Sequence, residues 1–569
     1  MLMVLVNWLY MAVTVFLAGY ALLSLFTRLF QYKIQYKVSY FLAGLLGVTV
    51  YAQFYSLFAG LKHGANLLLI CICFLIVVLE RKKLGRQLKD SYRRYRENRK
   101  QSWLCLSFSL ALILLFAYGT SRGYMHFDTG LYHAQSIRWI EEYGVVPGLA
   151  NLQSRFAYNS AAFSLTALYG LPKVFGQSLH TTAGFFALLS AFIAAGLKDA
   201  FTGRKLKLSH FVRLGLIFYL GVIFGEMVSP ASDYYAQLLV FDILILWLDQ
   251  DERQKEANRI CIEPYCLLCI LLVYAVTVKF SVGLLLLLVI KPAVYLIRTK
   301  KVKEIFTCLV SGILTALPFF IRNVIISGWM VYPATALDFF NVDWKFPKDQ
   351  ARLDALEIGA YGKGFHDVAM WDTPFKEWVP FWFGQLKPLE KAFAVAALLA
   401  VAVFLLWLIA GFLRKSKPNA DFILVTAVFS AAAAFWFLKA PLIRYGYAYI
   451  ITVPLLVYGY LYIRLADRIK KYSCPLCRVF QAAAVLFLLS RIPGLYEDIS
   501  TTVRQPYYVA QRDYDVCEAT TKELGGITFY IPAKQGQIGY DKFPSSLFAY
   551  PVELRGTDLS DGFRQIKEQ

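Results

Sequence analysis

Two histidines and one aspartate lie close together in a polar segment that follows an apolar run. His126, Asp128 and His133 all fall within residues 123–148. A carboxylate can accept the proton of a hydroxyl group and so act as a general base, and His and Asp side chains can also hold a divalent metal. Asp128 and His133 are five residues apart, so a helix would not place them on one face. The segment therefore favours acid–base chemistry at Asp128 over a metal site.

A short helix is predicted directly after Asp128, over residues 130–143. An apolar residue recurs every third position, as on one face of a helix: Leu131, Ala134, Ile137 and Ile140. Polar residues lie off that stripe, and Gly144 and Pro147 supply a stop signal. We expect an amphipathic helix that lies along the outer membrane interface with its polar side toward water or substrate.

Asp128 also occupies the position of a helix N-cap, which is the structural alternative to catalysis. A capping aspartate stabilises a helix by about 1 kcal/mol. The two roles are compatible, because the positive end of a helix keeps a carboxylate ionised. Asn caps a helix as well as Asp does but cannot accept a proton, so an Asp128→Asn variant distinguishes them.

Three cations end apolar runs on the side where Asp128 lies: Lys279, Arg322 and Arg444. Ionisable groups at membrane depth are costly and are therefore functional hypotheses, although each could instead reach to the interface as an anchor. Arginine binds phosphate in a bidentate manner and lysine binds it as a point charge. Together the three cations could hold an anionic head group.

These residues belong to a strongly apolar chain. Of its 569 residues, 58% are hydrophobic and 17% are charged, with a mean hydropathy of +0.51. Apolar runs of about 18 residues are typical of membrane-spanning helices. They cover residues 3–26, 39–60, 65–80, 103–119, 180–200, 211–226, 234–248, 260–278, 281–297, 305–321, 390–413, 421–438, 446–463 and 479–490. We predict an all-α polytopic membrane protein with about 13–14 transmembrane helices, embedded in a lipid bilayer.

Basic loops predict the orientation in the membrane. The segment 81–100 carries ten Lys and Arg against two acids, and such loops are cytoplasmic by the positive-inside rule. The net charge of +21 resides in these loops, so no nucleic-acid partner is expected. The larger pieces 120–179, 322–389 and 491–569 then lie outside. Residues 156–172 are expected to form a re-entrant or interfacial helix.

Three parts are predicted along the chain. Residues 1–102 form N-terminal transmembrane helices with a basic cytoplasmic loop. Residues 103–490 form the transmembrane core with its outer loops 120–179 and 322–389. Residues 491–569, with the β-like stretch "GITFYIP", form a small extracytoplasmic α/β domain.

The layout resembles the GT-C superfamily of membrane glycosyltransferases. The similar features are many spans, the acid in "MHFDTGLYHAQSIRWIEEYG" beside an interfacial helix, and "APLIRYG" at 440–446. The stretches "HFDTGLYH", "VVPGLANL", "RFAYNS", "VKFSVG", "SGWMVYP" and "NVDWKFP" look like a family of uncharacterised bacterial multi-pass proteins associated with surface polysaccharide. This second likeness covers most of residues 120–450 and part of the tail after residue 491.

The resemblance implies transfer of a sugar from a polyprenyl-phosphate-linked donor to a surface glycan, lipid or protein acceptor. Transfer would be inverting, on the extracytoplasmic face of the bacterial cell (inner) membrane, with Asp128 as general base. Lys279, Arg322 and Arg444 would hold the donor phosphate. Acceptor contacts would come from His126, Tyr132, His133, Arg138, Arg155, Tyr158 and Asn159. No cofactor or metal is expected, with a divalent metal left open.

Two features depart from the superfamily pattern. Asp128 follows about the fourth span rather than the first, and Thr129 and Gly130 follow it, so no D-x-D or adjacent acidic pair is present. The second departure makes a metal-dependent variant less favoured. A polysaccharide polymerase or ligase, and a transporter or flippase of lipid-linked sugars, are the alternatives.

Overall fold

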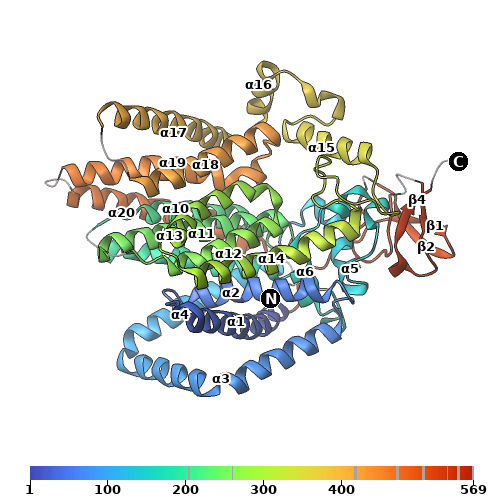
Figure 1. Ribbon diagram of the computed structural model, residues 1–569, viewed down its shortest axis with the longest axis horizontal. Helices are drawn as coiled ribbons and strands as arrows, with labels where there is room; N and C mark the ends of the chain where they lie inside the picture. The colour runs from blue at the N-terminus through green and yellow to red at the C-terminus, as the bar shows by residue number, and fades with distance from the viewer. Residues whose placement is uncertain are drawn as a thin grey trace.

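The protein is a mostly helical bundle. The structure is a computed structural model that describes residues 1–202, 205–258, 260–415, 419–469, 473–502, 507–534, 536–547 and 551–566. Its longer helices are α1 (Leu2–Phe30), α2 (Val38–Tyr55), α3 (His63–Glu97), α4 (Arg99–Ser121), α8 (Thr182–Ala194), α10 (Leu208–Ile223), α11 (Ser232–Ala257), α12 (Glu263–Val278), α14 (Val302–Ser327), α17 (Pro388–Leu413), α18 (Ala420–Lys439), α19 (Ile443–Arg468) and α20 (Ser473–Leu489). Figure 1 shows the bundle helices running along the long axis, with the strands at one end.

Shorter elements connect these helices. They are η1 (Thr129–His133), α5 (Ala134–Glu142), η2 (Leu149–Asn151), η3 (Ser154–Ala157), α6 (Ala161–Gly170), α7 (Pro172–Phe175), η4 (Ala195–Lys198), α9 (Asp199–Thr202), η5 (Phe224–Glu226), η6 (Phe280–Val289), α13 (Ile290–Arg298), α15 (Lys348–Gly362), η7 (Val368–Asp372), α16 (Phe375–Gln385), α21 (Ile492–Thr502) and η9 (Leu559–Asp561). The strands are β1 (Ala519–Leu524), β2 (Ile527–Pro532), β3 (Val552–Leu554) and β4 (Phe563–Gln565).

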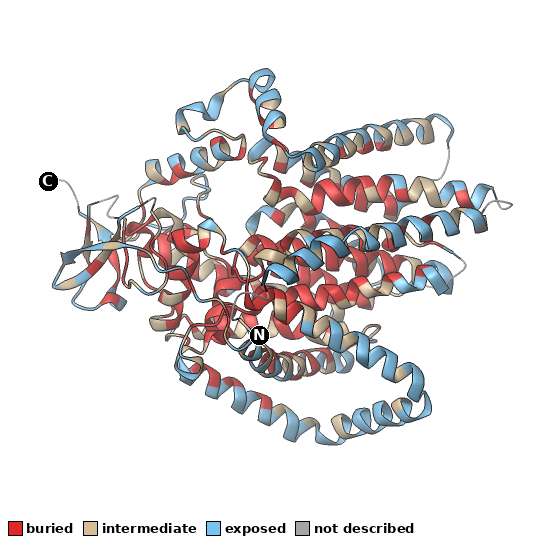
Figure 2. Ribbon diagram, turned by 180° about the vertical axis from the view of Figure 1, so that it is seen from behind, coloured by how far each residue is buried: buried red, intermediate tan, exposed pale blue. Residues whose placement is uncertain are grey.

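Within the described residues, twelve helical segments are long and apolar enough to cross a membrane. Each of the 14 predicted runs falls on a helix, but two runs are not among the twelve. The run 260–278 forms α12, which has only 16 residues, and the run 234–248 forms α11, which carries several acidic residues. Helix α11 contacts α8, α10, α12 and α19, and protein covers most of its length (Figure 2). A helix buried in protein can hold polar residues that a lipid-facing helix cannot.

The basic segment 81–100 is helical rather than a loop. Helix α3 continues to Glu97 and α4 begins at Arg99. Lys, Arg, Gln and Glu are good helix formers, and an ion pair of 2.8 Å joins Arg93 to Glu97 one turn away. The basic side chains extend the helix beyond its apolar part and stay exposed.

The stretch predicted as re-entrant or interfacial is a short helix inside the protein. All ten residues of α6 are buried. The side-chain amides of Asn7 and Asn66 donate to the backbone oxygens of Tyr169 (2.9 Å) and Leu168 (3.0 Å). These bonds satisfy carbonyl groups that a helix end leaves unpaired. Neighbouring helices thus supply the polar partners that water would supply at an exposed interface.

The helix predicted after Asp128 is also covered by protein. It begins as the π-helical turn η1 and continues as α5. Its polar side faces residues near the end of the chain instead of water. The Gln135 side chain donates to the backbone oxygens of Gly539, Tyr540 and Lys542 at 2.9–3.2 Å. The amphipathic pattern was correct, but the polar face binds the C-terminal region (residues 507–566).

That C-terminal region contains two small antiparallel sheets. Strands β1 and β2 form a hairpin in which Leu524 pairs with Ile527, and β3 pairs with β4. Gly525 and Gly526 both have positive φ, as a two-residue type I′ turn requires. The stretch "GITFYIP" contains β2, as predicted. The start of the predicted domain is the helix α21, and the first strand begins at Ala519.

We expect a Gln135→Ala variant to loosen the C-terminal region. Removing a fully buried amide leaves three carbonyl groups without this donor, at a cost of about 1–3 kcal/mol. The measurements are the midpoint of thermal unfolding in detergent and the rate of proteolytic cleavage after residue 502. Gln87→Ala, on the exposed part of α3, is the control. Equal cleavage rates in the two variants would contradict the docking role.

Candidate functional site

Hydrogen bonds to the backbone on both sides of Asp128 fix its position, and none of them uses its carboxylate. It stands at the N-cap position of η1 but makes no side-chain capping bond. The C-terminal region binds the backbone on both sides: Gln537 Nε2 donates to the Phe127 oxygen at 3.1 Å, and the amides of Ile538 and Gly539 donate to the Gly130 oxygen at 2.8 and 2.9 Å. The capping alternative is therefore wrong for this side chain.

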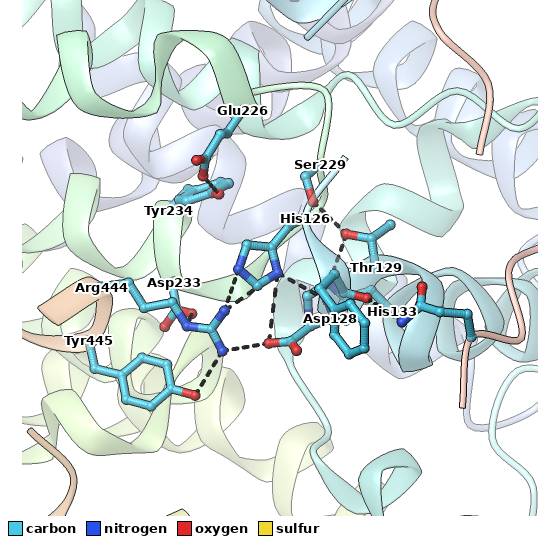
Figure 3. A network of polar contacts seen from close by, with 12 residues as sticks. His126, Asp128, Thr129, His133, Glu226, Ser229, Asp233, Tyr234, Arg444 and Tyr445 are labelled. Carbon is cyan, nitrogen blue, oxygen red and sulfur yellow. Dashed lines mark hydrogen bonds and ion pairs between the residues drawn. The ribbon is translucent and has the colours of Figure 1, made fainter. Parts of the chain in front are cut away.

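Arg444 is the partner of the Asp128 carboxylate (Figure 3). It is the second residue of α19, and its Nη2 donates to Asp128 Oδ2 at 2.6 Å and to the Tyr445 hydroxyl at 3.1 Å. Its Nη1 contacts the ring of His126, and its Nε lies 3.8 Å from Asp233 Oδ2. One guanidinium thus joins segments that are 316 residues apart in the chain.

Lys279 is connected to the same set of side chains by an ion pair with Asp233. It stands in extended backbone between α12 and η6, so its side chain leaves the helix stack. Its Nζ forms an ion pair with Asp233 Oδ1 and lies 3.9 Å from the centre of the Tyr445 ring, in cation–π contact. Asp233 lies in the first turn of α11, where the helix dipole favours a carboxylate.

We call Asp128, Asp233, Lys279 and Arg444 the charge cluster. Its two cations balance its two carboxylates. Burial alone would raise the pKa of Asp128, but the Arg444 guanidinium and the neighbouring histidines hold that pKa below its ordinary value. Burial, together with Arg444, lowers the pKa of His126. The cluster therefore contains an ionised carboxylate beside a neutral imidazole at neutral pH.

The charge cluster separates two cavities. One, of about 510 Å³, is lined by His126, Asp233 and Arg444. The other, of about 280 Å³, is lined by Lys279 and Tyr445. The Asp128 and Arg444 side chains are 21% and 23% exposed, so small molecules can reach both groups. Asp233 and Arg444 thus face the larger cavity and Lys279 faces the smaller one.

Arg322 lies apart from the charge cluster, unlike the other two predicted phosphate-binding cations. It is 1% exposed, its Nη1 donates to Ser56 Oγ at 2.6 Å, and its Nε donates to Asn159 Oδ1 at 3.3 Å. Asn159 also donates to Asn323 Oδ1 at 3.0 Å. Asn159 and Asn323 both line the smaller cavity. Arg322 therefore supports one wall of that cavity from behind.

His133 and Tyr132 belong to η1, the helical turn directly after Asp128. His133 is 2% exposed, and its Nδ1 lies 3.2 Å from Thr129 Oγ1, which in turn contacts Ser229. Burial lowers the pKa of His133 to about 3. Tyr132 packs edge-on against the His133 ring and lines the smaller cavity.

The other predicted acceptor contacts hold protein segments. Arg138 Nη1 donates to the backbone oxygens of Tyr540 and Asp541 in the C-terminal region, at 2.8 and 2.9 Å. Arg155 pairs with Glu357 of α15 at 3.3 Å. Tyr158 donates to Asp354 of α15 and lines the smaller cavity together with Asn159.

Asp233 and Tyr445 were missed by sequence reasoning. Asp233 stands just before the apolar run 234–248, on the same predicted side as Lys279. An acid in that place is the expected counter-ion for a cation at membrane depth, so the signal was present. Tyr445 follows Arg444 directly, but an aromatic residue at a membrane interface is too common to single out. Among the described residues, no group of three or more His, Cys, Asp or Glu side chains is placed to hold a metal ion.

The twelve long apolar helices make this chain a multi-pass membrane protein of the lipid bilayer. Residues 1–451 match the family described as "Domain of unknown function (DUF8201)", so the chain belongs to that family. The matched part contains the whole charge cluster and ends before the C-terminal region. The chain has no match among curated proteins.

We expect the neutral state of His133 to make stability depend on pH. Its pKa is about 3 in the folded protein and about 6.5 in an unfolded chain. Below pH 6.5 the unfolded chain therefore takes up a proton that the folded protein does not, and stability falls as the pH decreases, by up to about 1.4 kcal/mol per pH unit. Above pH 7 this contribution is constant.

The measurement is the thermal unfolding midpoint in detergent between pH 5 and pH 7.5. We expect His133→Asn to make the decline toward pH 5 shallower, because the unfolded chain then has one proton fewer to bind. His366→Asn, at an exposed position, should keep the slope of the unmodified protein. A His133→Asn protein with the unmodified slope would rule out a buried neutral imidazole.

Proposed function

We propose that this protein is a membrane glycosyltransferase. It moves a sugar from a polyprenyl-phosphate-linked donor to a glycan, lipid or protein acceptor on the extracytoplasmic face of a bacterial cell membrane. The observation that carries the proposal is the Asp128–Arg444 ion pair of 2.6 Å, whose arginine lines the larger cavity. The pair sets a proton acceptor beside a phosphate-binding cation, as transfer from a lipid phosphate to a hydroxyl group requires.

The reaction that fits is a single displacement. The acceptor hydroxyl oxygen forms a bond to the anomeric carbon, and the bond from that carbon to the lipid phosphate oxygen breaks. The electron pair leaves with the lipid phosphate, and the hydroxyl proton passes to Asp128. Oδ2 of Asp128 accepts from Arg444, whereas Oδ1 has no hydrogen-bond partner among the described residues, so Oδ1 is the oxygen that takes the proton. One displacement inverts the anomeric centre.

Charge balance links proton transfer to departure of the phosphate. Arg444 forms an ion pair with Asp128 and neutralises its charge. When Asp128 takes up a proton it loses its negative charge, while the leaving lipid phosphate gains one. Arg444 and Lys279 can then neutralise the phosphate, as preorganised cations do for charge that develops in a transition state. Proton acceptance and leaving-group stabilisation thus use the same guanidinium.

The two cavities suit different substrate parts. Phe280, Phe319 and Trp436 line the smaller cavity beside Lys279, which fits a lipid-linked phosphate. Trp382, Gln385 and other polar and aromatic side chains line the larger cavity, which fits a sugar that stacks on rings and forms hydrogen bonds. We assign the donor to the smaller cavity and the acceptor to the larger one.

A polymerase or ligase would use the same chemistry with a lipid-diphosphate-linked donor. The assay therefore compares lipid monophosphate and lipid diphosphate donors. A transporter of lipid-linked sugars would move the lipid without forming a glycosidic bond. An assay that separates free donor from glycosylated acceptor distinguishes transfer from transport.

We expect Asp128→Asn to abolish sugar transfer while leaving the fold intact. Asn can accept a hydrogen bond from Arg444 but cannot take a proton, and loss of a general base costs about 10²–10⁴-fold in rate. The measurement is transfer from radiolabelled polyprenyl-phosphate sugars to a glycan acceptor by the purified protein, with the thermal midpoint as the check on folding.

Asp349→Asn is the matched control, because it makes the same change at an exposed position in the first turn of α15. It should retain full activity. A folded Asp128→Asn protein that transfers sugar at the unmodified rate would refute the base. If the unmodified protein moved labelled lipid across a vesicle without transfer, the glycosyltransferase proposal itself would be lost.

A further inference from the structure

A second charged group lies at the far end of α11 from the charge cluster. Asp233 lies in the first turn of α11, and Asp249 follows 16 residues later in the same helix. A rise of 1.5 Å per residue puts the two carboxylates roughly 24 Å apart along the axis. Basic segments surround this far end, including residues 28–37 and 205–213, which the positive-inside rule places in the cytoplasm.

A cavity of about 620 Å³ opens at this end. The five basic lining residues are Lys37, Lys198, Lys207, Arg213 and Arg253, and the two acidic ones are Asp199 and Asp249. Two bonds of 3.1 and 2.6 Å join Arg213 to Asp249, and both residues are buried. This pair is neutral overall, so the remaining charge of the lining is positive.

The other cations of the cavity lining differ in whether a protein group already binds them. Lys207 pairs with Glu256 at 2.8 Å. Arg253 donates to Gln35 Oε1 at 2.6 Å and stacks on the Tyr36 ring at 4.2 Å. Lys37 and Lys198 form no ion pair with any acid among the described residues, and both are exposed. These two lysines are the cations available to an anion from outside.

The interior of the cavity is apolar. Phe41 from α2, Phe185 and Phe192 from α8, and Leu246 from α11 line it. A second apolar cavity of about 830 Å³, between α4, α10 and the segment α20–α21, shares Lys198 with the first. A basic entrance therefore adjoins apolar space that is large enough for a hydrocarbon chain.

We propose that this cavity binds an anionic phospholipid, one whose phosphate charge is not balanced within its head group, from the cytoplasmic leaflet. The phosphate lies at Lys37 and Lys198, and the chain lies along Phe185 and Phe192 toward the adjoining cavity. A free phosphate ion would leave the apolar walls unused, and an uncharged lipid would leave the lysines unpaired. The site goes beyond the proposed transfer reaction and does not depend on it, since it lies at the opposite end of α11.

The test measures lipid binding to the purified full chain by native mass spectrometry after lipid is removed. The probes are phosphatidylglycerol, phosphatidylcholine with the same chains, and inorganic phosphate. We expect phosphatidylglycerol to bind most tightly. Each lysine near an anionic lipid contributes about fivefold in affinity, so a Lys37→Gln/Lys198→Gln variant should bind phosphatidylglycerol about 25-fold more weakly.

Lys82→Gln/Lys89→Gln is the matched control, with the same loss of charge on an exposed part of α3. It should bind like the unmodified protein, and thermal midpoints verify that both variants are folded. Equal weakening in the two double variants would show diffuse attraction and overturn the site. Equal binding of phosphatidylcholine, or inorganic phosphate that displaces phosphatidylglycerol at micromolar concentration, would also overturn it.

Discussion

The ion pair between Asp128 and Arg444 is the constraint on which the arrangement of four distant segments depends. Partly buried charges cost several kcal/mol each unless they are paired. The cluster satisfies this condition only when η1, the start of α11, the break after α12 and the start of α19 lie together, since each supplies one charge. Removing one partner leaves a charge that the others cannot balance. The four segments are therefore positioned as a unit, although they are distant in the chain.

Helix α11 relates this cluster to the rest of the molecule. Its ends carry carboxylates that pair with cations, and between them Asp242 Oδ2 accepts from Ser190 Oγ at 2.7 Å. Neighbouring helices surround α11, so its carboxylates at 233, 242 and 249 find their partners in protein and not in lipid. The polar residues that make α11 a poor membrane-spanning sequence are thus the ones that fix its depth among its neighbours.

The amino-acid sequence predicts the helices of the bundle well, because their apolar runs are local and long. It also singles out Lys279 and Arg444, because ionisable groups at membrane depth are costly, and Asp128, because it directly precedes a predicted amphipathic helix. It does not reveal the protein that covers the polar face of α5 and the whole of α6, since a local pattern shows that a face is polar or apolar but not whether water or protein covers it. The local pattern also does not show that Arg322 lies apart from the charge cluster. Its partners Ser56 and Asn159 are distant in the chain, and nothing near Arg322 indicates them.

The bonds from residues 537–539 to the backbone around Asp128 bear on the modularity of the protein. The family match stops at residue 451, yet three donors beyond it hold the carbonyl groups of Phe127 and Gly130. The boundary of the family and the boundary of the working unit therefore do not coincide. A relative that lacks this terminal segment would need another source for the three donors. A fragment cut at residue 451 would contain every charged group of the site, but it would lack the three hydrogen bonds that hold the backbone on both sides of Asp128.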